Sequence, residues 1–306
     1  MNIEALLMDE LIISKSELYR FAKTAPHRYK KYKIAKRNGV GTRDIAQPSK
    51  QVKYFQRLIV HELEARLPVH LVATAYKKGV GIKENALMHL DHKYMLKMDF
   101  ENFFPSIQPS FLFGVCDVLN LDLSPNDKEL ISNFLFYKLR KNSPLRLSIG
   151  APSSPFISNV VMFLFDSSIV EYCKGRNITY TRYADDLTFS TNVKDSLYEI
   201  PNIIKKELII NTYKNIRINK NKTVFTSKAK NRHVTGVTLT NDDLLSIGRK
   251  RKRLISSMVH KFKQGRLDKE RIYELKGLLS FANHIEPIFI FRLRGKYGDC
   301  AIDSLI

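Results

Sequence analysis

The spacing of apolar residues predicts helices at both ends of the chain and strands in its middle. Residues 3–37 carry apolar side chains at helical spacing. The same periodicity predicts further helices over residues 51–67, 127–141, 155–174, 248–264 and 268–284. Alternation with a period of two predicts a strand over residues 93–100, and two β-rich runs within residues 178–190 predict a hairpin. This order of elements favours a mixed α+β fold with a helical C-terminal tail.

The composition indicates a protein with a sizeable core and a polyanionic partner. Of the 306 residues, 44% are hydrophobic, which excludes a disordered or collagen-like chain. Lys and Arg outnumber Asp and Glu by 51 to 30, a formal net charge of +21. An excess of this size indicates either nucleic acid or an anionic membrane as the partner.

Two further features argue against a membrane and for a reducing compartment. The longest apolar run, Val160–Phe165, is closed by Asp166 and is far shorter than the roughly 20 residues of a spanning helix. Cys116, Cys173 and Cys300 lie far apart, without the spacing of a zinc site. We therefore expect a cytoplasmic protein that handles nucleic acid and has no membrane partner.

A basic segment near the N-terminus interleaves cations with tyrosines, a combination that suits single-stranded nucleic acid. Its members are Arg28, Tyr29, Lys30, Lys31, Tyr32, Lys33, Lys36 and Arg37. The alternative is the solvated basic face of a helix. The overall excess of positive charge favours contact with RNA.

Two acidic positions carry the candidate chemistry. Asp99 closes the strand predicted over residues 93–100, and Asp185 and Asp186 occupy the tip of the predicted hairpin. Carboxylates from two strands can hold a pair of Mg²⁺ ions about 3.5–4 Å apart, which supports in-line phosphoryl transfer to a hydroxyl. Because neighbouring strand residues point to opposite faces, we expect one of the two hairpin aspartates to coordinate directly and the other peripherally. The alternative is that the Asp pair is only a turn signal.

The residues around these carboxylates resemble those of reverse transcriptases. Tyr183–Asp186 resembles the YxDD motif of that family, and Met98–Phe104 resembles its first catalytic-aspartate motif. The resemblance implies a right-hand polymerase with fingers, an antiparallel palm sheet with surrounding helices, and a helical C-terminal thumb. It also implies that the three aspartates are catalytic. The implied metal set, for two Mg²⁺ ions or Mn²⁺ in their place, is Asp99, Phe100, Asp185 and Asp186.

The same resemblance implies a pocket for the incoming deoxynucleotide. Phe104 stands where the family has an aromatic gate against a 2′-hydroxyl, although ordinary core packing is the alternative for this ring. Residues 148–155 (SIGAPSSP) resemble the PQGxxxSP loop under the nascent base pair. We therefore expect Gly150, Ala151 and Pro152 to contact the nucleotide.

Further positions bear on this pocket. Ser148 and Ile149 replace the usual Pro-Gln of the loop, which removes the contact of that glutamine but should leave catalysis intact. Arg43 lies in a segment that resembles the fingers region near the triphosphate, and it is a candidate phosphate contact. Lys222 lies in a motif whose lysine is close to the departing pyrophosphate, where it could stabilise or protonate the leaving group. The alternative for Lys222 is a solvated surface residue.

Two motifs narrow the resemblance to bacterial retron reverse transcriptases. Asn85–His89 reproduces an NAxxH motif and Val234–Gly236 a VTG motif, in the right order around the polymerase motifs. His89 could alternatively be a buried helix histidine, and Gly236 a plain turn glycine. The resemblance covers about residues 28–285. The residues expected to contribute to RNA recognition are Asn85, His89, Val234, Thr235, Gly236, Arg249, Arg251 and Arg253.

Membership of the retron family would define the reaction and its partners. The family copies a cognate structured noncoding RNA (msr-msd) from the 2′-hydroxyl of a specific guanosine, which gives branched, RNA-linked single-stranded DNA (msDNA). Deoxynucleotides are the substrates, host RNase H trims the template, and the product joins an anti-phage complex with an effector protein.

Two alternatives stay open beside the retron reading. One is a reverse transcriptase of another bacterial class, from a group II intron or a diversity-generating element. The missing maturase segment argues against the intron version, and the two motifs argue against both. The other alternative is a non-catalytic RNA-binding protein with the same fold, against which the intact aspartates speak.

Three regions are expected along the chain. Residues 1–40 form a basic helical segment, residues 41–240 the fingers and palm, and residues 241–306 a helical, RNA-binding thumb. The basic run 249–253 offers phosphate contacts, which position a duplex without reading its sequence.

Overall fold

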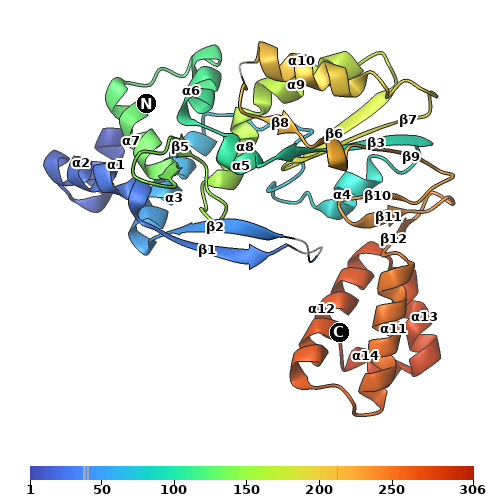
Figure 1. The fold of residues 1–306 in the computed structure, drawn as a ribbon. Coiled ribbons are helices and arrows are strands. Elements are labelled where there is room, and N and C mark those ends of the chain that lie inside the picture. The colour runs from blue at the N-terminus through green and yellow to red at the C-terminus, as the bar shows by residue number, and fades with distance from the viewer. Residues whose placement is uncertain (37–38, 40, 212) are drawn as a thin grey trace.

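The central element of the fold is an antiparallel sheet of five strands (Figure 1). The computed structural model describes residues 1–36, 39, 41–211 and 213–306. The sheet consists of β6 (Ile178–Tyr183), β7 (Asp186–Thr191), β3 (Tyr94–Glu101), β8 (Arg217–Ile218) and β9 (Val224–Ser227). β3 pairs with β7 along one edge and with β8 and β9 along the other. In this register Asp99 lies opposite Asp186, so the two acidic positions of the sequence are neighbours in the sheet.

Helices drawn from residues 3–222 pack around this sheet. They are α1 (Ile3–Leu11), α2 (Lys15–Thr24), η1 (Ala25–His27), α3 (Lys50–Glu64), α5 (Phe103–Ser106), α6 (Pro109–Val118), α7 (Pro125–Leu135), α8 (Ser154–Val161), α9 (Phe163–Cys173), α10 (Ile200–Ile210) and η2 (Lys220–Lys222). Their apolar faces form the first core together with Leu96 and Met98 of β3.

A second core forms below the sheet in Figure 1, from a small sheet and the C-terminal helices. Its elements are β10 (Arg232–Val234), β11 (Val237–Leu239), β12 (Leu245–Ser246), α11 (Arg249–Lys263), α12 (Lys269–Ile285), α13 (Pro287–Tyr297) and α14 (Asp299–Asp303). Ala86 of α4 (Ile82–Leu87) and Met95 of β3 belong to this second core as well. β3 therefore contributes to both cores, because successive side chains of a strand point to opposite faces.

Two hairpins complete the fold. β1 (Tyr29–Ala35) and β2 (Thr42–Pro48) form a long ribbon that projects from the N-terminal half (Figure 1). β4 (Tyr137–Lys138) and β5 (Leu145–Arg146) form a short one.

The structure confirms the mixed α+β class predicted from the sequence. It also confirms the strand over residues 93–100, the hairpin over residues 178–190 and both C-terminal helices. The single helix predicted over residues 3–37 is wrong: α1 ends at Leu11, α2 covers Lys15–Thr24, and no α-helix follows among the described residues up to Lys36. Residues 29–35 are a strand, because each of them pairs with a residue of β2. Arg37 of the predicted basic segment lies outside the described residues.

Two other predicted helices are shorter than expected. The helix predicted over residues 127–141 ends at Leu135, because Phe136 is extended and leads into β4. The helix predicted over residues 155–174 is two helices, with a bend of 48° at Met162. Among the described residues, no single helix is long and apolar enough to cross a membrane, and only the bent pair α8–α9 reaches that length and composition together.

Candidate active site

Three aspartates meet at the tip of the β6–β7 hairpin, and we call them the carboxylate cluster. Asp99, Asp185 and Asp186 each offer a ligand oxygen, and these oxygens lie within 4.8 Å of one another. Both hairpin aspartates thus reach the same point, whereas the sequence led us to expect one of them to be peripheral. The reason is that Asp185 lies in the turn rather than in a strand, after Ala184 with a φ of 56°.

Burial and mutual repulsion keep the cluster from ionising fully by itself. Burial, with Asp99 adding to it, raises the pKa of Asp185. Burial together with the other two carboxylates raises the pKa of Asp186 to about 7. Lys222 Nζ donates to Asp99 Oδ2 at 2.7 Å. Partial burial acts to lower the pKa of Lys222, this hydrogen bond acts to raise it, and the net result is a raised pKa. Converging carboxylate oxygens are the ligands that Mg²⁺ prefers, so the donor set fits a divalent cation.

Backbone hydrogen bonds fix the cluster to the sheet. The Phe100 amide donates to the Asp185 carbonyl at 3.1 Å, and the Asn219 amide donates to the Asp99 carbonyl at 2.8 Å. Phe100 is buried and its side chain carries no ligand atom, so it can join a metal site only through its backbone carbonyl.

A pocket of about 350 Å³ contains much of the predicted nucleotide site, and we call it the Phe104 pocket. Of the predicted residues, it is lined by Phe104, Gly150, Ala151 and Pro152. Gly150 has a φ of 118°, and a Cβ there would lie 3.1 Å from the Ile45 side chain. The Ala46 amide also donates to the Ile149 carbonyl at 2.9 Å. Gly150 thus permits a close backbone approach, here to β2.

The pocket has lining residues that the sequence analysis missed. Lys53 and Arg57 lie one turn apart on α3, and Tyr76 lies in the segment between α3 and α4. The spacing of Lys53 and Arg57 on an amphipathic helix was a usable signal, since it places both cations on one face. The hydroxyls of Ser148 and Ser154, which also line the pocket, are buried and have no hydrogen-bond partner among the described residues. Such hydroxyls suit a polar ligand.

Arg43 and Lys222 lie near the cluster rather than in the lining of the pocket. Arg43 is exposed on β2, close enough for its charge to lower the pKa of Asp185 slightly against the stronger effect of burial. Lys222 is held on Asp99, so it is not a free surface lysine.

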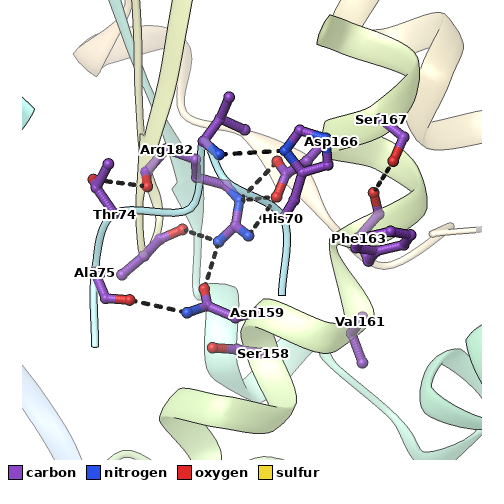
Figure 2. A network of polar contacts seen from close by, with 12 residues as sticks. His70, Thr74, Ala75, Ser158, Asn159, Val161, Phe163, Asp166, Ser167 and Arg182 are labelled. Carbon is purple, nitrogen blue, oxygen red and sulfur yellow. Dashed lines mark hydrogen bonds and ion pairs between the residues drawn. The ribbon is translucent and has the colours of Figure 1, made fainter. Parts of the chain in front are cut away.

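Behind the turn between β6 and β7, a buried ion pair supports the carboxylate cluster (Figure 2). Arg182 and Asp166 are both fully buried, with 2.6 Å between Arg182 Nη2 and Asp166 Oδ2. Arg182 Nη1 also donates to the Ala184 carbonyl and to Asn159 Oδ1, each at 3.1 Å. Asp166 on α9 and Asn159 on α8 therefore both bind the guanidinium, which the bend between these helices permits. A paired, hydrogen-bonded charge of this kind stays rigid in the interior.

The motif residues Asn85, His89 and Val234 do not lie on an RNA-accessible surface, because their side chains are fully buried. The expectation that they contact RNA directly is therefore wrong. His89 Nδ1 lies 2.6 Å from Ser190 Oγ and Nε2 lies 2.7 Å from Thr181 Oγ1, so His89 links α4 to β6 and β7. Burial lowers the pKa of His89 to about 3, and the ring stays neutral.

The two retron-type motifs meet at a seam, which we define as α4 and the turn 88–90 that follows it, packed against β10–β12. Thr235 Oγ1 donates to the Ile82 carbonyl at 3.5 Å. Arg251 Nη1 donates to the Gly236 carbonyl at 2.6 Å, and its guanidinium lies over the Phe281 ring at 5.1 Å. Arg251 therefore ties α11 to the VTG turn instead of pointing freely into solvent.

The other predicted RNA contacts are on the surface. Arg249 and Arg253 are exposed on α11, and Lys30 and Lys33 are exposed on β1. Tyr32 is 42% exposed and available for stacking. Its neighbour Tyr29 instead packs on Tyr137, with 5.2 Å between ring centroids.

The chain is similar in sequence to known reverse transcriptases. The reverse transcriptase (RNA-dependent DNA polymerase) family matches residues 34–239. The Retron Ec83 reverse transcriptase of Escherichia coli is 50% identical over 279 residues, which cover 90% of this chain and 89% of that protein. The Retron Ec73 reverse transcriptase of E. coli is 32% identical and covers 97% of this chain and 95% of that protein.

A solved structure shares the fold at much lower sequence identity. Telomerase from Candida albicans, solved in complex with a fragment of telomeric RNA, aligns with a TM-score of 0.51 at 13% identity. The alignment covers 90% of this chain and 60% of that protein. Sequence family, shared fold and carboxylate cluster agree, and the chain belongs to the retron reverse transcriptases, a family of RNA-directed DNA polymerases that use divalent metal ions.

Proposed function

We propose that the chain makes msDNA: it copies a cognate msr-msd RNA from the 2′-hydroxyl of one guanosine and gives a branched, RNA-linked DNA. The observation that carries this proposal is the carboxylate cluster beside the Phe104 pocket, in a chain half identical to a retron reverse transcriptase.

In this reaction the hydroxyl oxygen attacks the α-phosphorus of a deoxynucleotide, the hydroxyl proton passes to water, and the bond from the α-phosphorus to the leaving pyrophosphate breaks. Asp99, Asp185 and Asp186 would hold two Mg²⁺ ions, with Mn²⁺ as a substitute, and the Phe100 carbonyl would complete the set. When bound, the ions supply positive charge that activates the hydroxyl and stabilises the phosphorane-like transition state. Lys222 moves from Asp99 to the departing pyrophosphate, while Arg43 contacts the triphosphate.

The Phe104 pocket receives the deoxynucleotide. The Phe104 ring excludes a 2′-hydroxyl, and the loop of Gly150, Ala151 and Pro152 packs under the nascent base pair. Ile149 stands where the family has glutamine, so this part of the pocket is apolar. The hydroxyls of Ser148 and Ser154, which have no hydrogen-bond partner in the part of the chain that the structure describes, support a polar ligand here.

The chain is divided as a right hand in this proposal. The β1–β2 ribbon and the helices around it are the fingers, the five-stranded sheet is the palm, and the C-terminal helices are the thumb. Arg249 and Arg253 contact RNA phosphates, and Arg251 with Thr235 and Gly236 sets the position of the thumb.

The wider proposal places the protein in the cytoplasm as part of an anti-phage system. An effector protein joins the RNA–DNA product, and host RNase H trims the template. The formal charge of +21 supports a nucleic-acid partner.

Sequencing the nucleic acid that co-purifies with the protein tests the proposal. We expect single-stranded DNA joined to one structured RNA through a 2′–5′ bond. Treatment with a debranching enzyme should release the DNA, and the Asp185→Asn variant should carry the RNA alone. Linear DNA, or a random RNA population, would contradict the proposal.

A further inference from the structure

Tyr76 adopts a backbone conformation that bulky residues rarely adopt. Its φ is 62°, in the left-handed region, and its side chain is 55% exposed. A non-glycine residue at such an angle costs free energy and persists only where the surrounding structure imposes it. The segment that leads to Tyr76 is therefore the place to look for that constraint.

Residues 72–75 are bound to Arg182 and Asn159 (Figure 2). The Arg182 amide donates to the Val72 carbonyl at 2.8 Å, and the Thr74 amide donates to the Arg182 carbonyl at 2.8 Å. Asn159 Nδ2 donates to the Ala75 carbonyl at 2.9 Å. The segment 72–75, directly before Tyr76, is thus fixed from both the hairpin and α8.

The same two residues, Arg182 and Asn159, also hold the carboxylate cluster. The Arg182 guanidinium binds the Ala184 carbonyl directly before Asp185, and Asn159 Oδ1 accepts from the same guanidinium. Tyr76 and Asp185 are therefore positioned by one buried network, although 109 residues of chain separate them (185 − 76).

Tyr76 lines the Phe104 pocket together with the loop of Gly150, Ala151 and Pro152. Burial raises the pKa of the Tyr76 hydroxyl, Asp185 and Tyr183 add to this effect, and Arg43 opposes it. The ring is thus close to the groups that would handle the triphosphate. An aromatic face in this place suits the flat base and the sugar of a nucleotide.

We propose that Tyr76 is a second aromatic wall of the deoxynucleotide pocket, that its ring packs on the incoming nucleotide, and that Asn159 is the positioning residue that holds it there. This inference rests on the proposed function of the pocket. It assigns Tyr76 to binding of every deoxynucleotide, whereas Phe104 discriminates the sugar.

Steady-state addition of dTTP to oligo(dT) on poly(rA) tests the role of the ring. We expect Tyr76→Ala to raise KM for dTTP about tenfold, the loss typical of a stacked base, with kcat within about threefold of wild type. Tyr76→Phe should stay close to wild type because the ring is kept. Tyr198→Ala removes a tyrosine of similar exposure outside the pocket and should change neither constant.

Tyr76→Gly separates the ring from the backbone. Glycine adopts positive φ freely, so this variant loses the ring without keeping the strain. If the ring binds the nucleotide, Gly and Ala should raise KM alike. If KM for dTTP rose with Tyr76→Ala but not with Tyr76→Gly, the proposal would be overturned, and the effect would come from the backbone.

Asn159→Asp tests the tether, because it keeps an acceptor for Arg182 and loses the donor to Ala75. We expect KM for dTTP to rise more than kcat falls, with the fold checked by thermal melting.

The proposal would be overturned if wild type extends the primer and the folded Tyr76→Ala variant has an unchanged KM for dTTP. Failure of the proposed function is distinguishable, since wild type would then not extend this primer at all.

Discussion

The carboxylate cluster and the seam both consist of family motifs, but one opens onto a pocket and the other is closed. Asp185 and Asp186 reach the surface beside the Phe104 pocket. Asn85 and His89 are fully buried where α4 packs against the second core. A motif can therefore identify a family through chemistry in one place and through packing in another.

The physical demands of the two regions differ accordingly. The cluster must keep like charges together, and burial and repulsion raise the pKa of Asp186 to about 7 until a cation or a proton compensates them. The seam must leave no polar group unpaired, and His89 uses both ring nitrogens to achieve this. Asn85 is the exception, because its side-chain amide has no partner among the described residues.

The largest expected effect is at the cluster. Asp185→Asn or Asp99→Asn should lower DNA synthesis at least about 100-fold, because a metal ligand and transition-state stabilisation are lost. RNA affinity should be largely retained, since the basic surface is unchanged. Primer extension and gel shift on the same preparations measure the two quantities. Synthesis at the wild-type rate by Asp185→Asn would rule out the two-metal assignment.

The corresponding change in the seam should act on stability. His89→Ala should lower the free energy of unfolding by about 2–4 kcal/mol, because it leaves a cavity, removes the partner of the buried Thr181 hydroxyl and removes one of the two partners of Ser190 Oγ. Urea unfolding measures this, and His92→Ala, which removes a half-buried ring from the same Ser190, should cost less. Lost RNA affinity at unchanged stability would instead make His89 an RNA contact.

A smaller effect is expected at Phe104, which lines the Phe104 pocket. Phe104→Val or Phe104→Ala should raise ribonucleotide use relative to deoxynucleotide use by on the order of tenfold or more, because space opens beside the sugar. The measurement is the ratio of kcat/KM for the two nucleotides. An unchanged ratio would mean that the ring only packs against its neighbours, such as Phe103 at 5.5 Å.

The smallest expected effect distinguishes the exposed Arg249 and Arg253 of α11 from Arg251 on the same helix. Replacing Arg249 and Arg253 together by Gln should weaken RNA binding and flatten its salt dependence by up to about two phosphate equivalents. Arg251→Gln should change the salt slope less, because Arg251 is engaged with Gly236, but it should reduce branched initiation more than extension of an annealed primer. Filter binding over a salt series and the two synthesis assays provide the comparison. Equal behaviour of all three arginines would make α11 a generic phosphate clamp.

Much of the site could be predicted because its motifs are local. Asp99 at a strand end, the Asp pair in a β-turn-β frame and Gly150 in its loop are each readable within about ten residues of sequence. The strand β1 could not be predicted from its own residues, because Tyr29–Ala35 becomes a strand only by pairing with Thr42–Pro48. Its spacing of apolar and basic residues is compatible with a helix, and only the partner strand decides between them.

The sequence by itself determined the mixed α+β class, the three aspartates as the candidate site, four residues of the Phe104 pocket (Phe104, Gly150, Ala151 and Pro152) and the positive charge, because periodicity, motif order and composition need no knowledge of distant contacts. Only the tertiary structure decided which polar residues are buried and which neighbours they have. It placed Tyr76 in the pocket through Arg182, and it turned His89 and Arg251 from candidate RNA contacts into ties between elements. The reason is that burial and pairing depend on residues from 15 to about a hundred positions away, and local pattern carries no information about them.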